Sequence, residues 1–133
     1  MFKTLTVHTK STSEFVDITA ELTELVKESG ITDGVCYVYV PHTTAGVTVN
    51  ESYDRAVARD IETTLSRLVP RLGDYLHGEG NSAAHIKATL VGSTVTLLVN
   101  DGALSLGRWQ GVYFCEFDGP RTRQVLVRIA GLP

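Results

Sequence analysis

The sequence is poor in cysteine, with only Cys36 and Cys115 among its 133 residues. Two cysteines cannot build the disulfide framework of a small secreted domain, and a chain of this length can bury a core without one. Each cysteine lies inside an apolar, strand-like stretch, so we expect two buried thiols. The length also predicts one domain over residues 1–133.

Long apolar runs and an excess of positive charge are lacking as well. No stretch approaches the length of a membrane span, and the chain opens on an alternating segment in place of an apolar leader. The net charge of −3 does not favour nucleic acid or anionic lipid as a partner. With 43% hydrophobic residues, the composition is that of a globular domain. We therefore expect a cytoplasmic protein that binds neither nucleic acid nor a membrane.

The common motifs of phosphate-binding loops and hydrolases are missing. There is no Gly-x-x-x-x-Gly-Lys-Ser/Thr loop and no Gly-x-Gly-x-x-Gly, which argues against the nucleotide-binding folds that depend on them. Neither Ser82 nor Ser105 lies in a Gly-x-Ser-x-Gly turn, so a hydrolase triad has no support.

The hydrophobic pattern predicts two amphipathic helices among several strands. Apolar residues recur at helical spacing over residues 18–26 and 57–68, with Asp17 or Thr19 capping the first helix and Asp54 the second. Strand patterns cover residues 2–9, 35–40, 47–50, 86–91, 94–99, 112–117 and 124–129, and residues 71–84 resemble a loop. Because strands and helices do not alternate regularly, we expect an α+β fold with a mostly antiparallel, sandwich-like core.

Three of the four histidines lie in polar, glycine-rich segments. His42 occupies a turn between two predicted strands, whereas His77 and His85 flank residues 78–82, Gly-Glu-Gly-Asn-Ser. Neutral imidazole is the commonest transition-metal ligand, and it titrates near neutral pH. We interpret the three as one zinc-like site with an open position; the alternative is three independent loop histidines. His8 lies in an alternating strand and is expected at the surface.

Aromatic and positively charged residues gather near the C-terminal end. Trp109 offers a stacking surface and Gln110 a neutral hydrogen-bonding group, while Arg121 and Arg123 alternate as on one face of a strand. Arginine is suited to bidentate recognition of phosphate or carboxylate. The alternative is a solvated hairpin in which Asp118 and Arg121 form a surface pair worth about 0–1 kcal/mol.

These segments together resemble the YjbQ-like family of small proteins described as secondary thiamine-phosphate synthase. The matching pieces are Pro41-His42-Thr43-Thr44-Ala45, Asn50-Glu51, Asp54, His77, Glu79-Gly80-Asn81, Ala84-His85, Leu106-Gly107, Trp109-Gln110-Gly111 and Glu116-Phe117-Asp118-Gly119-Pro120-Arg121. The similarity runs nearly end to end. It implies an α+β, β-sandwich-like fold that assembles as a homotrimer.

The resemblance also implies a transferase reaction, weak in this family. A pyrimidine diphosphate loses pyrophosphate, and a thiazole phosphate nitrogen captures its methylene carbon. Charge on the leaving diphosphate would be neutralised by arginines and a divalent ion such as magnesium, held by carboxylates such as Glu51. Three histidines, however, suit zinc, nickel or copper better than magnesium. If the site is built for another role and catalyses the synthase reaction only as a side activity, both the weak activity and the three histidines are explained.

Two hypotheses follow. The first is a metal-binding enzyme acting on a small phosphorylated molecule. Its metal ligands are His42, His77 and His85; its catalytic residues are Glu51, Glu79, Asn81 and Arg121; its substrate-binding residues are Thr43, Thr44, Asn50, Trp109, Gln110, Arg121 and Arg123. The second is a non-catalytic module that binds a small phosphorylated or sugar-like ligand through Trp109, Gln110 and Arg121.

Overall fold

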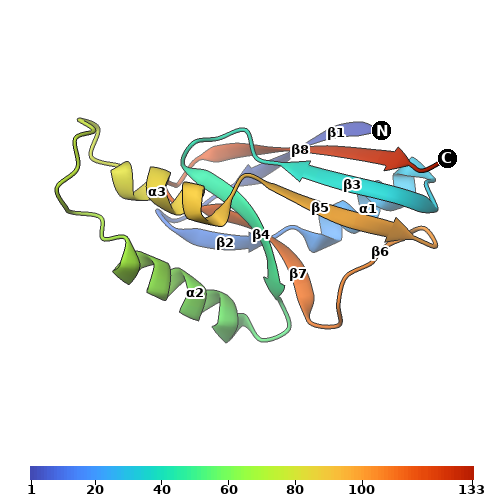
Figure 1. Ribbon diagram of the computed structural model, residues 1–133, viewed down its shortest axis with the longest axis horizontal. Helices are drawn as coiled ribbons and strands as arrows, with labels where there is room; N and C mark the ends of the chain where they lie inside the picture. The colour runs from blue at the N-terminus through green and yellow to red at the C-terminus, as the bar shows by residue number, and fades with distance from the viewer.

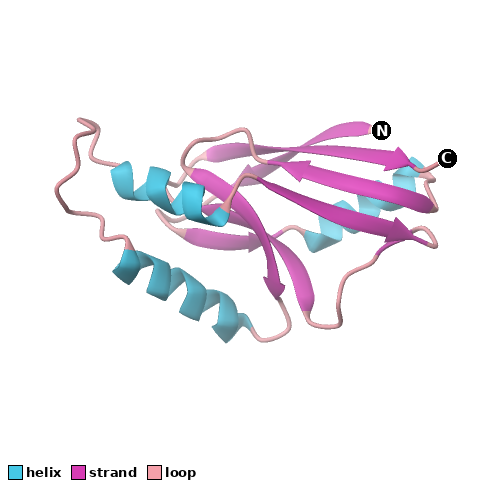
Figure 2. Ribbon diagram, in the orientation of Figure 1, coloured by secondary structure: helices cyan, strands magenta, loops and turns pink.

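The computed structural model describes all 133 residues as three helices and eight strands (Figures 1 and 2). In chain order the elements are β1 (Phe2–His8), β2 (Glu14–Asp17), α1 (Thr19–Ser29), β3 (Asp33–Tyr39), β4 (Ala45–Glu51), α2 (Arg55–Leu68), α3 (Ser82–Val91), β5 (Thr94–Asn100), β6 (Ala103–Leu104), β7 (Gln110–Glu116) and β8 (Thr122–Gly131).

The strands form two antiparallel sheets. One has five strands in the order β1-β8-β3-β5-β6, and the other has three in the order β2-β7-β4. The two sheets face one another, and Figure 1 shows α1 at one end of them and α2 and α3 at the other. The predicted α+β fold with an antiparallel, sandwich-like core is confirmed.

The main core fills the space between the sheets. On β8 alternate residues Val125, Val127 and Ile129 are buried, and on β7 Val112 and Phe114 face them. This period of two is the signature of strands with one face toward a core. Helix α1 adds Leu22 and its apolar neighbours to the same cluster.

A second core lies on the other face of the three-stranded sheet. Tyr113 and Cys115 of β7 point to that face, where Ala58 of α2 and Ala84 and Ala88 of α3 cover them. Because both faces of β7 are covered, this strand is buried from Gly111 through its end. The expectation of buried thiols is confirmed, since Cys36 and Cys115 are both inaccessible and free.

The helix ends follow the predicted signals. Asp54 caps α2 by accepting a hydrogen bond from the backbone N–H of Ala56 at 2.9 Å. The start of α1 differs, because its N-cap residue is Ile18 without a side-chain cap; the predicted Asp17 acts one position earlier, where its carboxylate accepts from the backbone N–H of Thr19 at 2.9 Å. Gly30 ends α1 in the left-handed conformation, with a φ of 68°.

One predicted strand is wrong, because residues 86–91 belong to α3. The apolar run looked strand-like when taken alone, but the buried residues of α3 are Ala83, Ala84, Lys87 and Ala88. That spacing marks one face of a helix, and the alanines let the helix approach the sheet closely. The predicted loop over 71–84 therefore stops at Asn81, and a third helix follows. None of the three helices has the length and apolar character needed to cross a bilayer.

Candidate functional site

A pocket of about 430 Å³ gathers most of the residues singled out in the sequence. We call it the histidine pocket; it is lined by Pro41, His42, Thr43, Thr44, His77, Glu79, Asn81, His85, Asp118, Arg121 and Arg123. These residues come from the β3–β4 loop, the loop before α3, α3 itself, the turn that joins β7 to β8, and the start of β8. All three histidines of the predicted site therefore line one pocket.

Strand register explains why these segments meet. Ala45, at the start of β4, is paired with Glu116, at the end of β7. The loop before β4 and the turn after β7 therefore lie at the same end of the three-stranded sheet. Helix α3 packs beside β4, which brings the loop before the helix to that end as well (Figure 1).

His42 is held by a backbone contact. Its Nε2 accepts a hydrogen bond from the backbone N–H of Gln124 at 3.0 Å. An acceptor nitrogen carries no proton, so the neutral ring has its proton on Nδ1. Burial and the nearby Arg123 guanidinium lower the pKa of His42. Both effects keep this imidazole uncharged.

His77 and His85 lie edge to face. Their ring centroids are 5.3 Å apart at an interplanar angle of 88°, and His77 Nε2 is 3.8 Å from a Glu79 carboxylate oxygen. These donors are of the kind that zinc prefers. As the side chains stand, however, no group of three or more His, Cys, Asp or Glu is arranged to hold a metal ion, and His42 Nε2 is already engaged. In this arrangement the three histidines therefore do not form a shared metal site.

Asp118 links the arginine and the asparagine of the pocket. Arg121 donates from Nη2 to the Asp118 carboxylate at 2.8 Å and from Nε to the Asp118 carbonyl at 2.7 Å. Asn81 donates to the same carboxylate oxygen at 2.9 Å. Burial would raise the pKa of Asp118, but the hydrogen bonds from Asn81 and Arg121 outweigh it and lower the pKa. The Asp118–Arg121 pair expected for a solvated hairpin does form, and it forms at the wall of the pocket.

Arg123 is committed to a buried ion pair. It donates from Nε to a Glu116 carboxylate oxygen at 2.8 Å and from Nη2 to the Thr44 hydroxyl at 2.8 Å. Arg123 and Glu116 are both buried, and their pair closes the inter-sheet core at the floor of the pocket. Arg123 therefore contributes positive charge to the pocket from a buried position, whereas the guanidinium of half-exposed Arg121 is accessible to a ligand.

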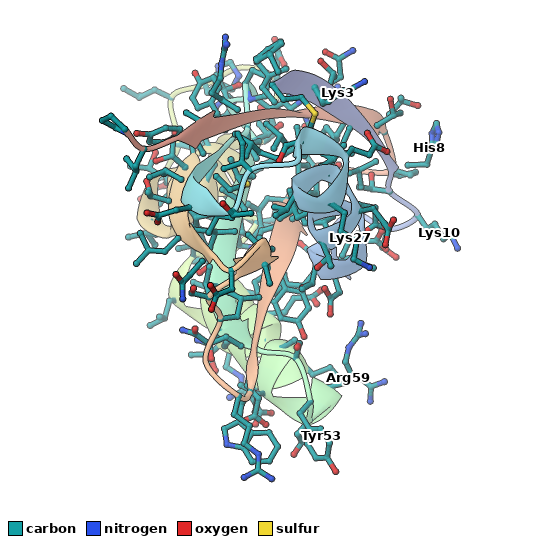
Figure 3. The ribbon with its side chains drawn as sticks, turned by 90° about the vertical axis from the view of Figure 1, so that its right-hand side faces the viewer. Lys3, His8, Lys10, Lys27, Tyr53 and Arg59 are labelled. Atoms are coloured by element: carbon teal, nitrogen blue, oxygen red, sulfur yellow. The ribbon has the colours of Figure 1, made fainter.

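Four predicted site residues lie elsewhere: Asn50, Glu51, Trp109 and Gln110. Glu51 is paired with Gln110 at the far end of β4 and β7, about 20 Å along the strand from Ala45. Glu51 accepts from the backbone N–H of Asp54 at 3.3 Å, as a helix cap would. Trp109 packs against Tyr53 with centroids 4.9 Å apart, and Tyr53 lies at the lower tip of the molecule in Figure 3. Within one chain these residues are separate from the histidine pocket.

His8 points away from the molecule on β1 (Figure 3). Its Nδ1 lies 3.3 Å from the hydroxyl of Thr122 at an exposed position. It takes no part in the pocket, as the alternating pattern around it predicted.

A family model described as UPF0047 protein YjbQ-like matches residues 3–132. The chain belongs to this family. It is 48% identical over 125 residues to UPF0047 protein MJ1081 of Methanocaldococcus jannaschii, covering 94% of this chain and 91% of that protein. It is 45% identical over 132 residues to UPF0047 protein YugU of Bacillus subtilis, covering 98% and 100% of the two chains.

Solved structures of relatives show the same fold. A YjbQ/UPF0047 protein from Clostridium acetobutylicum is 49% identical, with a TM-score of 0.95 over 96% of this chain and 99% of that one. A YbjQ-like protein of unknown function from Sulfolobus solfataricus is 34% identical, with a TM-score of 0.95 over 99% and 97%. These names state a family and no reaction, so membership does not support the thiamine-phosphate synthase activity that the resemblance implied.

Pro41 and Asp118 line the pocket but are absent from the predicted site, and of the two only Asp118 carries charge. The sequence carried a signal for it, since Asp118 lies within the Glu116–Arg121 segment that resembles the family. It was interpreted only as a surface partner of Arg121. Its second partner, Asn81, lies 37 positions away in the sequence, and only the folded chain brings the two together.

Proposed function

We propose that this member of the family is an enzyme that binds a small phosphorylated molecule in the histidine pocket. One observation carries the proposal: three imidazoles and the half-exposed guanidinium of Arg121 line a single cavity of about 430 Å³. That volume lies in the range of sites for small molecules. The pocket unites an anion-binding group with groups that exchange protons near neutral pH.

Arg121 is the proposed anchor for the phosphate. A guanidinium has five N–H donors, and Arg121 uses two of them on Asp118, which leaves three for a ligand. The Asp118 contacts also fix the direction of the guanidinium. Arg123, already bonded to Glu116 and Thr44, adds charge without direct contact.

The histidines are the proposed acid–base groups. His85 and His77 lie edge to face, and a Glu79 carboxylate oxygen lies 3.8 Å from His77 Nε2, where it would orient that ring. His42, held neutral with its Nε2 occupied, would donate a hydrogen bond from Nδ1 to the ligand. Thr43 and Asn81 are the remaining polar groups of the proposed binding surface.

Thermal-shift measurements with a panel of phosphorylated metabolites test the binding step. A ligand at about 100 times its dissociation constant stabilises the folded state by about 2.7 kcal/mol. We expect Arg121→Ala to abolish the shift, and His8→Ala, at an exposed position on β1 outside the pocket, to preserve it. A shift that survives in Arg121→Ala would contradict the anchor, and the absence of a shift with every compound would contradict the site.

Turnover separates the enzyme from the second candidate, a non-catalytic binding module. The first reaction to assay is release of pyrophosphate from a pyrimidine diphosphate in the presence of a thiazole phosphate. For an enzyme of this kind, His85→Ala should lower kcat while ligand binding persists. Tight binding of the ligand with no turnover of any bound compound would favour the binding module, in which the histidines serve only as hydrogen-bonding groups.

A second form of the proposal replaces acid–base catalysis by His77 and His85: in it these two histidines and Glu79 hold a divalent metal. The edge-to-face approach of the two rings and the adjacent carboxylate would need only side-chain rotation to share an ion. Metal content after mild purification, compared between the native protein and His77→Ala and His85→Ala, tests it. Equal metal content in all three proteins would rule the assignment out.

A homotrimer would account for the distance between the two predicted groups of residues. Trp109 is 45% exposed and Tyr53 78% exposed, so this aromatic tip is free to contact another copy of the chain. We propose that Trp109 and Gln110 of one copy complete the histidine pocket of the next. Light scattering would measure the assembly. Mixing inactive Arg121→Ala and Trp109→Ala chains should then restore activity in some pockets, and no restoration would argue for a site made by one chain.

A further inference from the structure

We propose that a second cavity, on the other side of the Asn81–Asp118 wall, is a separate binding site for a phosphate group. This cavity of about 240 Å³, here called the lysine cavity, lies between α2, α3 and the β1–β2 loop. Its polar lining includes Thr12, Ser13, Ser66, Arg71 and Lys87. It shares Glu79, Asn81 and Asp118 with the histidine pocket but contains none of the histidines.

Lys87 is a buried cation that lacks a counter-ion. It lies on the buried face of α3 and is 7% exposed. No carboxylate oxygen lies within 4.0 Å of its ammonium group, in contrast to Arg123, which is equally buried but fully paired. Its hydrogen-bond partner is the Ser66 hydroxyl at 3.3 Å, and its ring contact is Phe117, 5.9 Å from the ring centroid. Buried lysines are rare unless they are paired, so this ammonium group is suited to bind an anion.

The nearest carboxylate does not fill that role. Glu62 of α2 acts on Lys87 from beyond ion-pair distance, and burial together with the Glu14 carboxylate raises the pKa of Glu62. Burial lowers the pKa of Lys87 itself, as expected for an ammonium without a close anion. Two N–H donors of Lys87 remain free beside Ser66.

The other lining groups favour an anion with several oxygens. Arg71 has no carboxylate within 4.0 Å and faces the same cavity. Thr12, Ser13 and Ser66, each with a hydroxyl, line the same cavity, and the Ser66 hydroxyl lies 3.3 Å from the Lys87 ammonium group. A carboxylate offers two oxygens, whereas a phosphate offers enough acceptors to meet donors from four different segments. Of the two carboxylates on the wall, Asp118 is neutralised by Arg121 and Glu79 lies beside His77.

Isothermal titration with inorganic phosphate tests this site in the Arg121→Ala/Asp118→Asn protein, which removes the proposed anchor of the histidine pocket together with the wall carboxylate that Arg121 neutralises. We expect phosphate binding to persist there and to weaken by about tenfold or more when Lys87→Met is added, the factor that a lost charge-assisted hydrogen bond would produce. Lys10→Met, at an exposed position outside the cavity, is the matched control and should bind as before. A parallel titration with methyl phosphate shows whether the cavity takes a free or an esterified phosphate.

The outcomes separate the two proposals. No phosphate binding in folded Arg121→Ala/Asp118→Asn protein, or unchanged binding after Lys87→Met, would overturn the lysine cavity as a phosphate site and leave the histidine pocket unaffected. Should Lys87→Met fail to fold, Arg71→Ala decides the question, because Arg71 is exposed and its loss removes charge without disturbing a core. Unchanged phosphate binding in that variant would also overturn the proposal.

Discussion

Arg123 of β8 and Glu116 of β7 join the two sheets through a buried ion pair, with Arg123 Nε 2.8 Å from a Glu116 oxygen. The Thr9 hydroxyl also donates to Glu116 at 2.8 Å, and the backbone N–H groups of Phe117 and Asp118 donate to its second oxygen. Both carboxylate oxygens of Glu116 thus accept hydrogen bonds from the surrounding protein. The pair ends the apolar core and forms the floor of the histidine pocket.

Removing one member of this pair should destabilise the protein strongly. Glu116→Ala leaves Arg123 buried without a counter-ion, and we expect a loss of about 3–5 kcal/mol in the free energy of unfolding. Urea denaturation measures it. The exposed pair Glu24–Lys27, 3.4 Å apart, is the control, and Glu24→Ala should cost about 1 kcal/mol or less. Similar losses in the two variants would show that burial of the first pair has no energetic consequence.

Stability should fall in acid because of the same carboxylate. Burial would raise the pKa of Glu116, but hydrogen bonds from Arg123, the Asp118 N–H and Thr9 outweigh it and lower the pKa below its ordinary value of 4.5. A carboxyl whose pKa is lower in the folded than in the unfolded state stabilises the protein above the unfolded value and loses that effect as pH falls toward the folded value. Thermal denaturation from neutral pH into acid should therefore show a falling Tm.

Glu116→Gln provides the control for this dependence. It cannot ionise, so its Tm should be lower at neutral pH and should decline less steeply in acid. Parallel curves for the native protein and Glu116→Gln would assign the acid sensitivity to other carboxyl groups, such as Asp118.

The two thiols should be unreactive in the native protein. Burial raises the pKa of Cys36 to about 11 and raises the pKa of Cys115 as well. Only the thiolate reacts with disulfide reagents, and neither sulfur is accessible. When the protein is treated with an aromatic disulfide at mildly alkaline pH, we expect no cysteine to react rapidly in the folded protein and both cysteines to react in urea. Rapid labelling of either thiol without denaturant would show that the core opens readily.

Gly46 should not tolerate a side chain. A Cβ there would lie 2.5 Å from the carbonyl oxygen of Gly92 and 3.2 Å from Val91, where the end of α3 packs on β4. We expect Gly46→Ala to cost about 1–3 kcal/mol, as overpacking does. Gly78→Ala, at an exposed position with no atom within 4 Å of its Cβ, is the control and should be nearly neutral. Chemical denaturation of both variants compares them, and equal stabilities would mean that α3 can shift away from β4.

The short-range features of the fold could be predicted because their signals are local. Asp54 and Gly30 mark helix ends through their own side chain or backbone, and the alternating valines of β8 define a strand within six residues. The wrong prediction of a strand at residues 86–91 also arises because only local signals were used. A short apolar run suits a strand or a helix equally well, and only the packing of Ala84 and Ala88 on the sheet distinguishes them.

The candidate site divides in the same way. Residue types alone indicated imidazoles, a carboxylate and arginines with a capacity for metal, phosphate and proton chemistry. They could not indicate that Trp109 lies at one end of β7 and Asp118 beyond the other. Nor could they indicate that Arg123 forms a buried ion pair with Glu116. Those facts depend on strand register, which pairs positions that are far apart in the chain.

The amino-acid order by itself determined the chemical inventory, the antiparallel core and the α1 and α2 segments, because apolar periodicity and capping act between near neighbours. Tertiary structure alone decided that His42, His77 and His85 share one pocket and that Lys87 lies buried without a carboxylate. These placements follow from how the two sheets and three helices pack. The packing is stabilised by contacts throughout the core, so no short segment of the sequence determines it.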